Sequence, residues 1–164
     1  MTVTDELLEN NAEFARNFSK GDLPMPPGKG LAVVACMDAR LNVYALLGLA
    51  EGQAHVIRNA GGVVTEDVIR SLAISQHLLG TKEIILVHHT DCGMLTFTND
   101  QIRDMLKTDT GADASSIDFL PFDDVEQSVR DDVATVRNSP LIPNDIPVTG
   151  FVYDVRTGRL TEVR

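Results

Sequence analysis

The sequence predicts an α/β fold: a mainly parallel central sheet flanked by helices, with an N-terminal helical arm and a C-terminal edge hairpin. Two runs, Leu31–Cys36 and Ile84–Val87, are apolar throughout, as expected for parallel strands covered on both faces. Glu66–Leu79 lies between them with helical periodicity, which gives the strand, helix, strand order of a right-handed crossover. The 164 residues, 43% of them hydrophobic, suffice for one core, so we expect a single domain over residues 1–164.

The N-terminal part is expected to form a helix and an extended arm over residues 1–30, ahead of a core at residues 31–164. Apolar residues from Asp5 to Phe18 recur on one helical face, and Thr4 is a suitable N-cap. The prolines and glycines from Asp22 to Gly30 cannot continue a helix and predict an extended connection. This connection would let the helix lie away from the core and pack on a neighbouring subunit.

The first half of the core alternates strands and helices. In order, we expect a strand at Leu31–Cys36, a short helix at Val43–Leu49, a strand at His55–Arg58, a tight turn at Ala60–Gly62, a helix at Glu66–Leu79 and a strand at Ile84–Val87. Thr65 is the predicted N-cap of the long helix and Gly80 its stop. The second strand run would deliver His89 and Cys92 just past its end.

The second half begins with a capping box, in which Thr98 and Gln101 precede the apolar Ile102. A helix is therefore expected there, and a polar loop should follow from Lys107 to Asp118. The remaining predicted elements are a helix after Asp123, marked by valines at helical spacing, and a hairpin with strands at Val148–Val155 and Leu160–Val163.

The charge balance excludes several partners. With 14 basic and 24 acidic residues the net charge is −10, which disfavours nucleic acid and anionic membrane surfaces. No apolar run approaches the length of a membrane span. The N-terminus lacks the basic start and apolar stretch of a secretory signal, so a cytoplasmic, reducing location is expected.

Two cysteines and a histidine stand where two predicted strands end. Cys36, His89 and Cys92 are residue types that bind zinc, and three protein ligands leave the fourth position open, as in catalytic zinc sites. The alternative for Cys36 and Cys92 is a disulfide or two buried thiols. A reducing compartment disfavours the disulfide and favours metal binding.

The segments Cys36-Met37-Asp38-Ala39-Arg40 and His89-Thr90-Asp91-Cys92-Gly93 resemble those of the β-class carbonic anhydrases. The resemblance continues through Arg58–Gly62, the Glu66–Leu79 helix and Tyr153–Gly158. It implies one Zn²⁺ per chain held by Cys36, His89 and Cys92, with Asp38 and Arg40 as a catalytic pair. Arginine can grip a carboxylate through two parallel hydrogen bonds, which would keep Asp38 ionised and off the metal. The family usually has serine where this chain has Ala39.

The resemblance also implies the reaction, the reversible hydration of carbon dioxide to bicarbonate and a proton by a zinc-bound hydroxide. In some members the aspartate leaves its arginine for the fourth zinc position, which makes Asp38 a candidate ligand as well. We expect that closed form at lower pH and the open form at higher pH. A homodimer or dimer of dimers is implied, with the zinc cleft at the subunit boundary. The regulatory bicarbonate pocket of some members uses a tryptophan, and this chain has none.

Two other functions fit the same residues. Hydrolases of carbonyl sulfide or carbon disulfide resemble this family and share its zinc ligands, so the motifs do not separate them. A non-catalytic, zinc-stabilised interaction domain would have a permanently closed metal site, in which Asp38 and Arg40 have no role. Of the other histidines, His55 and His77 are interpreted as structural. His88 is interpreted as a packing residue, with a proton relay near the metal as the alternative.

Overall fold

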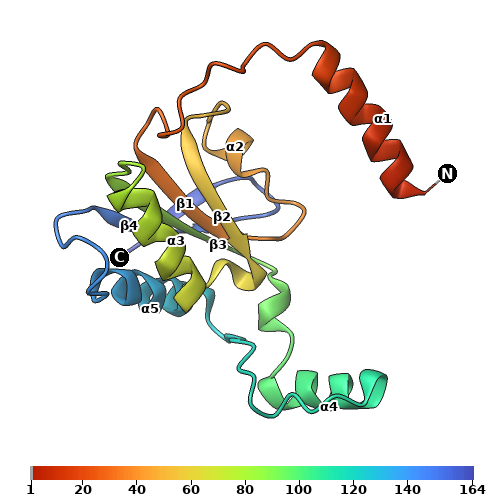
Figure 1. Ribbon diagram of the computed structural model, residues 1–164. Helices are drawn as coiled ribbons and strands as arrows, with labels where there is room; N and C mark the ends of the chain where they lie inside the picture. Colours follow the sequence, from red (N-terminus) through yellow and green to blue (C-terminus); the bar gives the residue numbers. More distant parts are fainter. Residues whose placement is uncertain (1) are drawn as a thin grey trace.

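The computed structural model describes residues 2–164 and contains a five-stranded sheet in the order β2-β1-β3-β4-β5 (Figure 1). The strands are β1 (Leu31–Cys36), β2 (Ala54–Asn59), β3 (Glu83–His89), β4 (Val148–Tyr153) and β5 (Leu160–Val163). The first four are parallel, and β5 pairs antiparallel with β4 at the edge. The predicted fold class is confirmed. The expected domain over residues 1–164 includes Met1, which lies outside the described residues.

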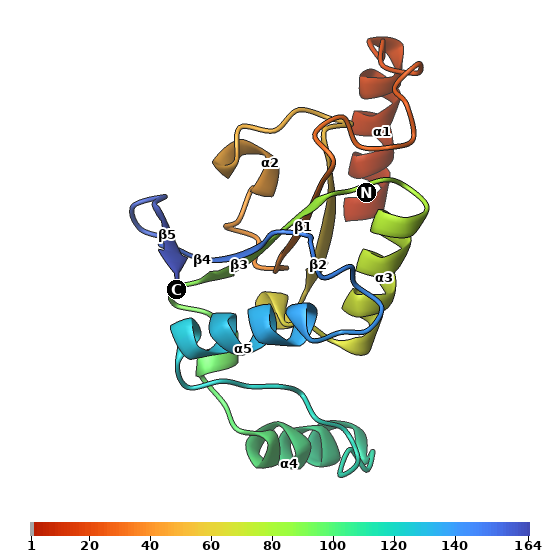
Figure 2. The same ribbon diagram turned by 90° about the vertical axis from the view of Figure 1, so that its left-hand side faces the viewer.

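Helices cover both faces of this sheet. The helices of residues 2–164 are α1 (Val3–Arg16), α2 (Val43–Leu46), α3 (Glu66–His77), α4 (Asn99–Thr110) and α5 (Val125–Arg137), with short 3₁₀ turns η1 (Ala60–Gly62) and η2 (Gly93–Leu95). Figure 2 shows α3 and α5 on one side of the sheet and α2 on the other. Within residues 2–164, no helix combines enough length with enough apolar character to span a lipid bilayer.

The core consists of two apolar layers, one on each side of β1 and β3. On one side, Val34 and Leu86 pack with Leu72 of α3 and Val136 of α5, all of them fully buried. On the other side, Val33 and Val87 belong to a cluster that includes α2. Because both faces are covered, every residue of β1 is buried, as its continuous apolar run predicts.

The N-terminal helix projects away from the sheet, as expected, but the prediction of Thr4 as its cap is wrong (Figure 1). Thr2 is the N-cap: its Oγ1 accepts a hydrogen bond from Asp5 N at 3.2 Å, and Asp5 Oδ2 accepts one from Thr2 N at 2.7 Å. This reciprocal capping box satisfies two backbone donors and starts the helix at Val3. No residue of α1 is buried.

Several predicted boundaries also shift. The helix α4 continues to Thr110, where Gly111 in the left-handed conformation ends it, so the loop predicted from Lys107 starts later. The short helix α2 ends at Leu46 and α3 at His77, before their predicted ends. The strand β3 includes His89, because its pairing with β4 continues to Tyr153.

Candidate metal centre

The carboxyl ends of β1 and β3 bring the first two candidate ligands together. The strands are adjacent and parallel, with Ala35 opposite Val87, so Cys36 and His89 end them at the same edge of the sheet. A short loop after β3 then places Cys92 at the start of η2. This is the edge at which open α/β sheets bind ligands.

The three side chains form a buried cluster. Their potential ligand atoms, the sulfurs of Cys36 and Cys92 and a ring nitrogen of His89, all lie within 4.8 Å of one another. Apolar side chains surround them, including the buried Leu41 and Met94. Both cysteines are free, so the structure gives no support to a disulfide. The sequence prediction that these residues gather is confirmed.

The environment of His89 fits a metal ligand. Its Nδ1 lies 2.8 Å from the carbonyl oxygen of Thr90, which can only accept, so Nδ1 carries the proton. In the neutral ring, the form that binds a metal, the lone pair is therefore on Nε2, which is buried and has no hydrogen-bond partner within the described residues. An unpaired buried acceptor is costly, and a cation bound between the sulfurs and this nitrogen would satisfy it.

The thiols of Cys36 and Cys92 shift each other's pKa in opposite directions. A hydrogen bond from Cys92 lowers the pKa of Cys36 to about 4 against the opposing effect of burial, and the same interaction raises the pKa of Cys92. Burial lowers the pKa of His89, but Cys36, the hydrogen bond with the Thr90 carbonyl oxygen and the charge of Asp38 together raise it above its ordinary value. Without a cation, these opposed pKa shifts favour one thiolate and one thiol over two thiolates. A divalent cation would allow both sulfurs to be thiolates, and this donor set suits Zn²⁺.

The turn η1 packs directly behind the first ligand. Gly62 has φ 71°, and a Cβ at this position would lie 2.7 Å from Cys36 N and 2.9 Å from Ala35 C. These atoms are backbone and cannot rotate away. The predicted turn is therefore also a support for Cys36, and only glycine fits there.

Asp38 and Arg40 form the two parallel hydrogen bonds that the sequence predicts. Arg40 donates from Nε to Asp38 Oδ1 at 3.0 Å and from NH2 to Asp38 Oδ2 at 2.8 Å, and its backbone N–H also reaches Oδ1. These hydrogen bonds hold the pKa of Asp38 well below its ordinary value. The carboxylate oxygen Oδ2 lies 3.7 Å from His89 Nε2, beside the cluster.

Two supporting residues were not identified from the sequence. Arg58 on β2 donates to the carbonyl oxygens of Cys36 at 3.0 Å and Asp38 at 2.7 Å, and so fixes the segment between them. Asp91 accepts hydrogen bonds from the far side of Arg40. Their presence in the resembling segments was the only sequence signal, because nothing in the spacing specifies these contacts.

The other histidines lie away from the cluster. His88 is fully buried, with Nε2 at 3.0 Å from Asp132 Oδ2 of α5, and its ring stacks on Phe122. Successive strand residues face opposite sides, so His88 points away from His89, which favours packing over proton relay. His55 contacts Ser75, and His77 contacts the carbonyl oxygen of Leu141, in agreement with structural roles.

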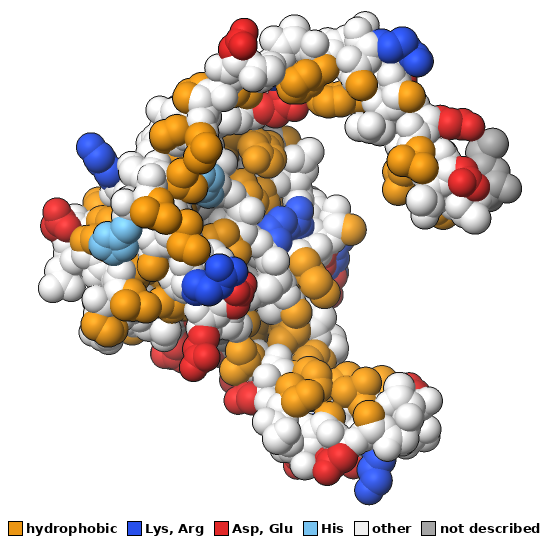
Figure 3. All heavy atoms as spheres, in the orientation of Figure 1, with side chains coloured by type: hydrophobic (Ala, Val, Ile, Leu, Met, Phe, Trp, Pro, Cys, Tyr) orange, Lys and Arg blue, Asp and Glu red, His pale blue; other side chains and the backbone are white. Residues whose placement is uncertain are grey.

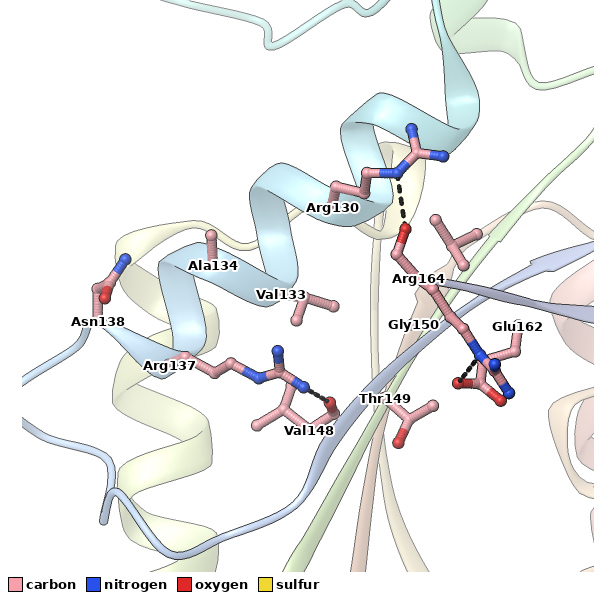
Figure 4. Close-up of a pocket in the computed structure, with 11 residues that line it drawn as sticks. Arg130, Val133, Ala134, Arg137, Asn138, Val148, Thr149, Gly150, Glu162 and Arg164 are labelled. Carbon is pink, nitrogen blue, oxygen red and sulfur yellow. Dashed lines mark hydrogen bonds and ion pairs between the residues drawn. The ribbon is translucent and has the colours of Figure 1, made fainter.

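A separate groove of about 680 Å³ lies between α5 and the β4–β5 edge (Figure 4). Arg137 donates to the carbonyl oxygen of Val148 at 2.7 Å, and Arg130 donates to that of Arg164 at 3.1 Å. None of the residues that line the groove is a candidate ligand. The chemistry expected from the sequence therefore belongs to the strand-end cluster.

The cysteine and histidine cluster lies at the carboxyl edge of a parallel sheet, beside a carboxylate and guanidinium pair. This arrangement defines an α/β protein with a candidate catalytic metal site. The family model described as carbonic anhydrase matches residues 31–160. The chain belongs to this family, in its β class.

Its relatives cover nearly the whole chain. Beta-carbonic anhydrase 1 of Mycobacterium tuberculosis is 56% identical over 99% of both chains. The crystal structure of a carbonic anhydrase from Streptococcus mutans has 52% identity and a TM-score of 0.96, covering 100% of this chain and 99% of that one. A carbon disulfide hydrolase from an Acidianus strain is 37% identical, covering 95% of this chain and 86% of that protein.

Proposed function

We propose that this protein catalyses the reversible hydration of carbon dioxide to bicarbonate and a proton, with one Zn²⁺ in a core formed by residues 31–164. The observation that carries this proposal is the buried Cys36, His89 and Cys92 cluster with an ionised Asp38 at its side. Membership of the carbonic anhydrase family supports the same reaction. A purely structural metal site would leave the Asp38 and Arg40 pair without a role.

Cys36, His89 and Cys92 would hold the zinc, because they offer two sulfurs and one unpaired nitrogen close together. When bound, zinc supplies the Lewis acidity that makes hydroxide available from water near neutral pH. Two thiolates offset the charge of a divalent ion, so this site should work best at alkaline pH. Asp38 is the candidate for a fourth ligand.

Asp38 would orient the attacking oxygen. An ionised carboxylate only accepts hydrogen bonds, so Asp38 fixes the O–H of the nucleophile and leaves a lone pair directed at the carbon of carbon dioxide. Arg40 keeps Asp38 ionised through the two parallel hydrogen bonds. The proton from each cycle passes to solvent or buffer, because the low pKa of Asp38 makes it a poor proton store.

The same aspartate could also close the site. Its Oδ2 lies 3.7 Å from His89 Nε2, so Asp38 is the carboxylate that would be available to a metal held by that nitrogen if it left Arg40. The open arrangement, with Asp38 paired to Arg40, should dominate at higher pH, because hydroxide would then compete better with the Asp38 carboxylate for the metal. A hydration rate that does not change from neutral to alkaline pH would contradict this switch.

We propose a homodimer, or a dimer of dimers, as the working assembly. Two helices, α1 and α4, project from the core, and Figure 3 shows hydrophobic side chains gathered on them. Leu7 and Leu8 of α1 are 59% and 64% exposed, and Met105 of α4 is 57% exposed. Burial of these surfaces against a second copy would stabilise the assembly and enclose the zinc cleft at the boundary.

Hydrolysis of carbon disulfide is the second candidate function, because the Acidianus carbon disulfide hydrolase is 37% identical to this chain. One zinc-loaded sample should be tested for carbon dioxide hydration by stopped flow and for sulfide release from carbon disulfide. We expect fast hydration, little sulfide release and loss of hydration in Cys92→Ser. Sulfide release that exceeds hydration would replace the proposed reaction with the hydrolase reaction.

A further inference from the structure

The guanidinium of Arg40 is held along two edges. Its Nε and NH2 edge faces the carboxylate of Asp38, as described above. Its NH1 and NH2 edge faces Asp91: NH1 donates to Asp91 Oδ2 at 2.7 Å, and NH2 donates to the backbone carbonyl oxygen of Asp91 at 2.9 Å. The planar group therefore makes four side-chain hydrogen bonds, two to each aspartate.

The backbone of Asp91 is arranged for this contact. Asp91 has φ 54°, one of two non-glycine residues with positive φ among residues 2–164. That conformation is unfavourable for most side chains, although aspartate tolerates it better than others. It turns the chain between His89 and Cys92, so that the carbonyl oxygen of Asp91 reaches Arg40 while the next residue delivers its sulfur to the cluster.

Arg40 needs a second anchor because its side chain is long and 46% exposed. A flexible arginine held only by Asp38 would follow that carboxylate whenever it moves. Asp91 cannot follow, since its backbone is fixed between the end of β3 and η2 and it has its own contact with Arg40.

We propose that Asp91 is a positioning residue for the hydration reaction: it fixes the guanidinium of Arg40 so that Arg40 keeps Asp38 off the metal site. This inference rests on the proposed function. The Asp91 carboxylate contacts Arg40 and is not part of the Cys36, His89 and Cys92 cluster. Its loss should therefore lower kcat and leave the KM for carbon dioxide nearly unchanged.

The test compares three variants of the full-length, zinc-loaded protein. Asp91→Gly removes the carboxylate and tolerates the positive φ, whereas Asp91→Asn tolerates the same φ and keeps an oxygen acceptor without the charge. The matched control is Asp67→Asn, which removes an exposed aspartate paired with Arg70 on α3. Nitrogen-15 NMR of the arginine side chains reports how freely the guanidinium of Arg40 rotates, and Arg40→Lys assigns its signals.

In Asp91→Gly we expect the Arg40 guanidinium to rotate faster and kcat to fall about five-fold, the scale of one exposed ion pair. Asp91→Asn should show a smaller increase in Arg40 rotation and a smaller loss of kcat than Asp91→Gly. Asp67→Asn should match the wild type in both. Unchanged Arg40 signals and unchanged kcat in Asp91→Gly would overturn the proposal, as would an equal effect of Asp67→Asn. If the wild type does not hydrate carbon dioxide at all, the proposed function fails, and the NMR comparison still decides whether Asp91 holds Arg40.

Discussion

Replacing Gly62 with alanine should destabilise the protein through the backbone behind the candidate metal site. The new Cβ would lie 2.7 Å from Cys36 N, 2.9 Å from Ala35 C and 3.1 Å from Val87 O, where ordinary contacts begin at 3.4 Å. Either η1 or the end of β1 must therefore move. Because Cys36 is at that end, the movement also displaces a candidate ligand.

The expected cost of Gly62→Ala has two parts. The left-handed conformation of Gly62 costs an alanine about 1–2 kcal/mol, and forcing a methyl group into a filled space costs about 1–3 kcal/mol. Gly80→Ala is the matched control, because Gly80 has a similar φ of 72° with nothing within 4 Å of its new Cβ. It should incur the conformational cost alone.

Urea denaturation of the metal-free proteins measures the unfolding free energy of each variant. A competition titration with a zinc chelator measures the zinc affinity of each variant. Gly62→Ala should lose about 3 kcal/mol of unfolding free energy and bind zinc more weakly, whereas Gly80→Ala should lose about 1 kcal/mol and bind zinc normally. Equal losses in the two variants, with equal zinc affinity, would refute the argument that Gly62 supports Cys36 by close approach.

Three further predictions concern the ligands, the aspartate and the arm. Cys92→Ser and His89→Ala should each lower zinc affinity at least about ten-fold, measured by chelator competition, and an unchanged affinity in either variant would exclude that residue as a ligand. Arg40 lowers the pKa of Asp38 below its ordinary 3.8, so this carboxylate should stabilise the metal-free fold above that pH and lose its contribution as the pH falls toward its lower folded-state pKa. Acid unfolding of Asp38→Asn should accordingly show a weaker pH dependence below about pH 4 than the wild type, and identical profiles would contradict the pairing. Removal of residues 2–18 should shift the protein from dimer to monomer in sedimentation, and an intact dimer would show that α1 does not hold the assembly.

The sequence predicted that Cys36, His89 and Cys92 lie together, and it did so for a specific physical reason. Apolar runs identify buried parallel strands, and residues at the carboxyl ends of adjacent strands meet at one edge. Cys36 and His89 needed no further information to be placed together. The loop from His89 to Cys92 is so short that Cys92 must lie close to His89.

The supports of the site were less predictable. The contact between Asp91 and Arg40 depends on a positive φ at a residue other than glycine, and Arg58 depends on the register of β2 against β1. Neither property is encoded in local spacing. The start of α1 was misplaced because Thr2 and Thr4 are both acceptable caps, and only the reciprocal contact with Asp5 selects Thr2.

The most direct test of the proposed function is a zinc titration of the hydration rate. The purified protein is stripped with a chelator, zinc is added back in steps, and the initial rate of carbon dioxide hydration is measured by stopped flow at alkaline pH. We predict that the rate rises linearly and stops rising at one zinc per chain, and that Cys92→Ser stays inactive throughout. Full activity without zinc, or no hydration at one zinc per chain, would contradict the proposal that the Cys36, His89 and Cys92 cluster is the active metal site.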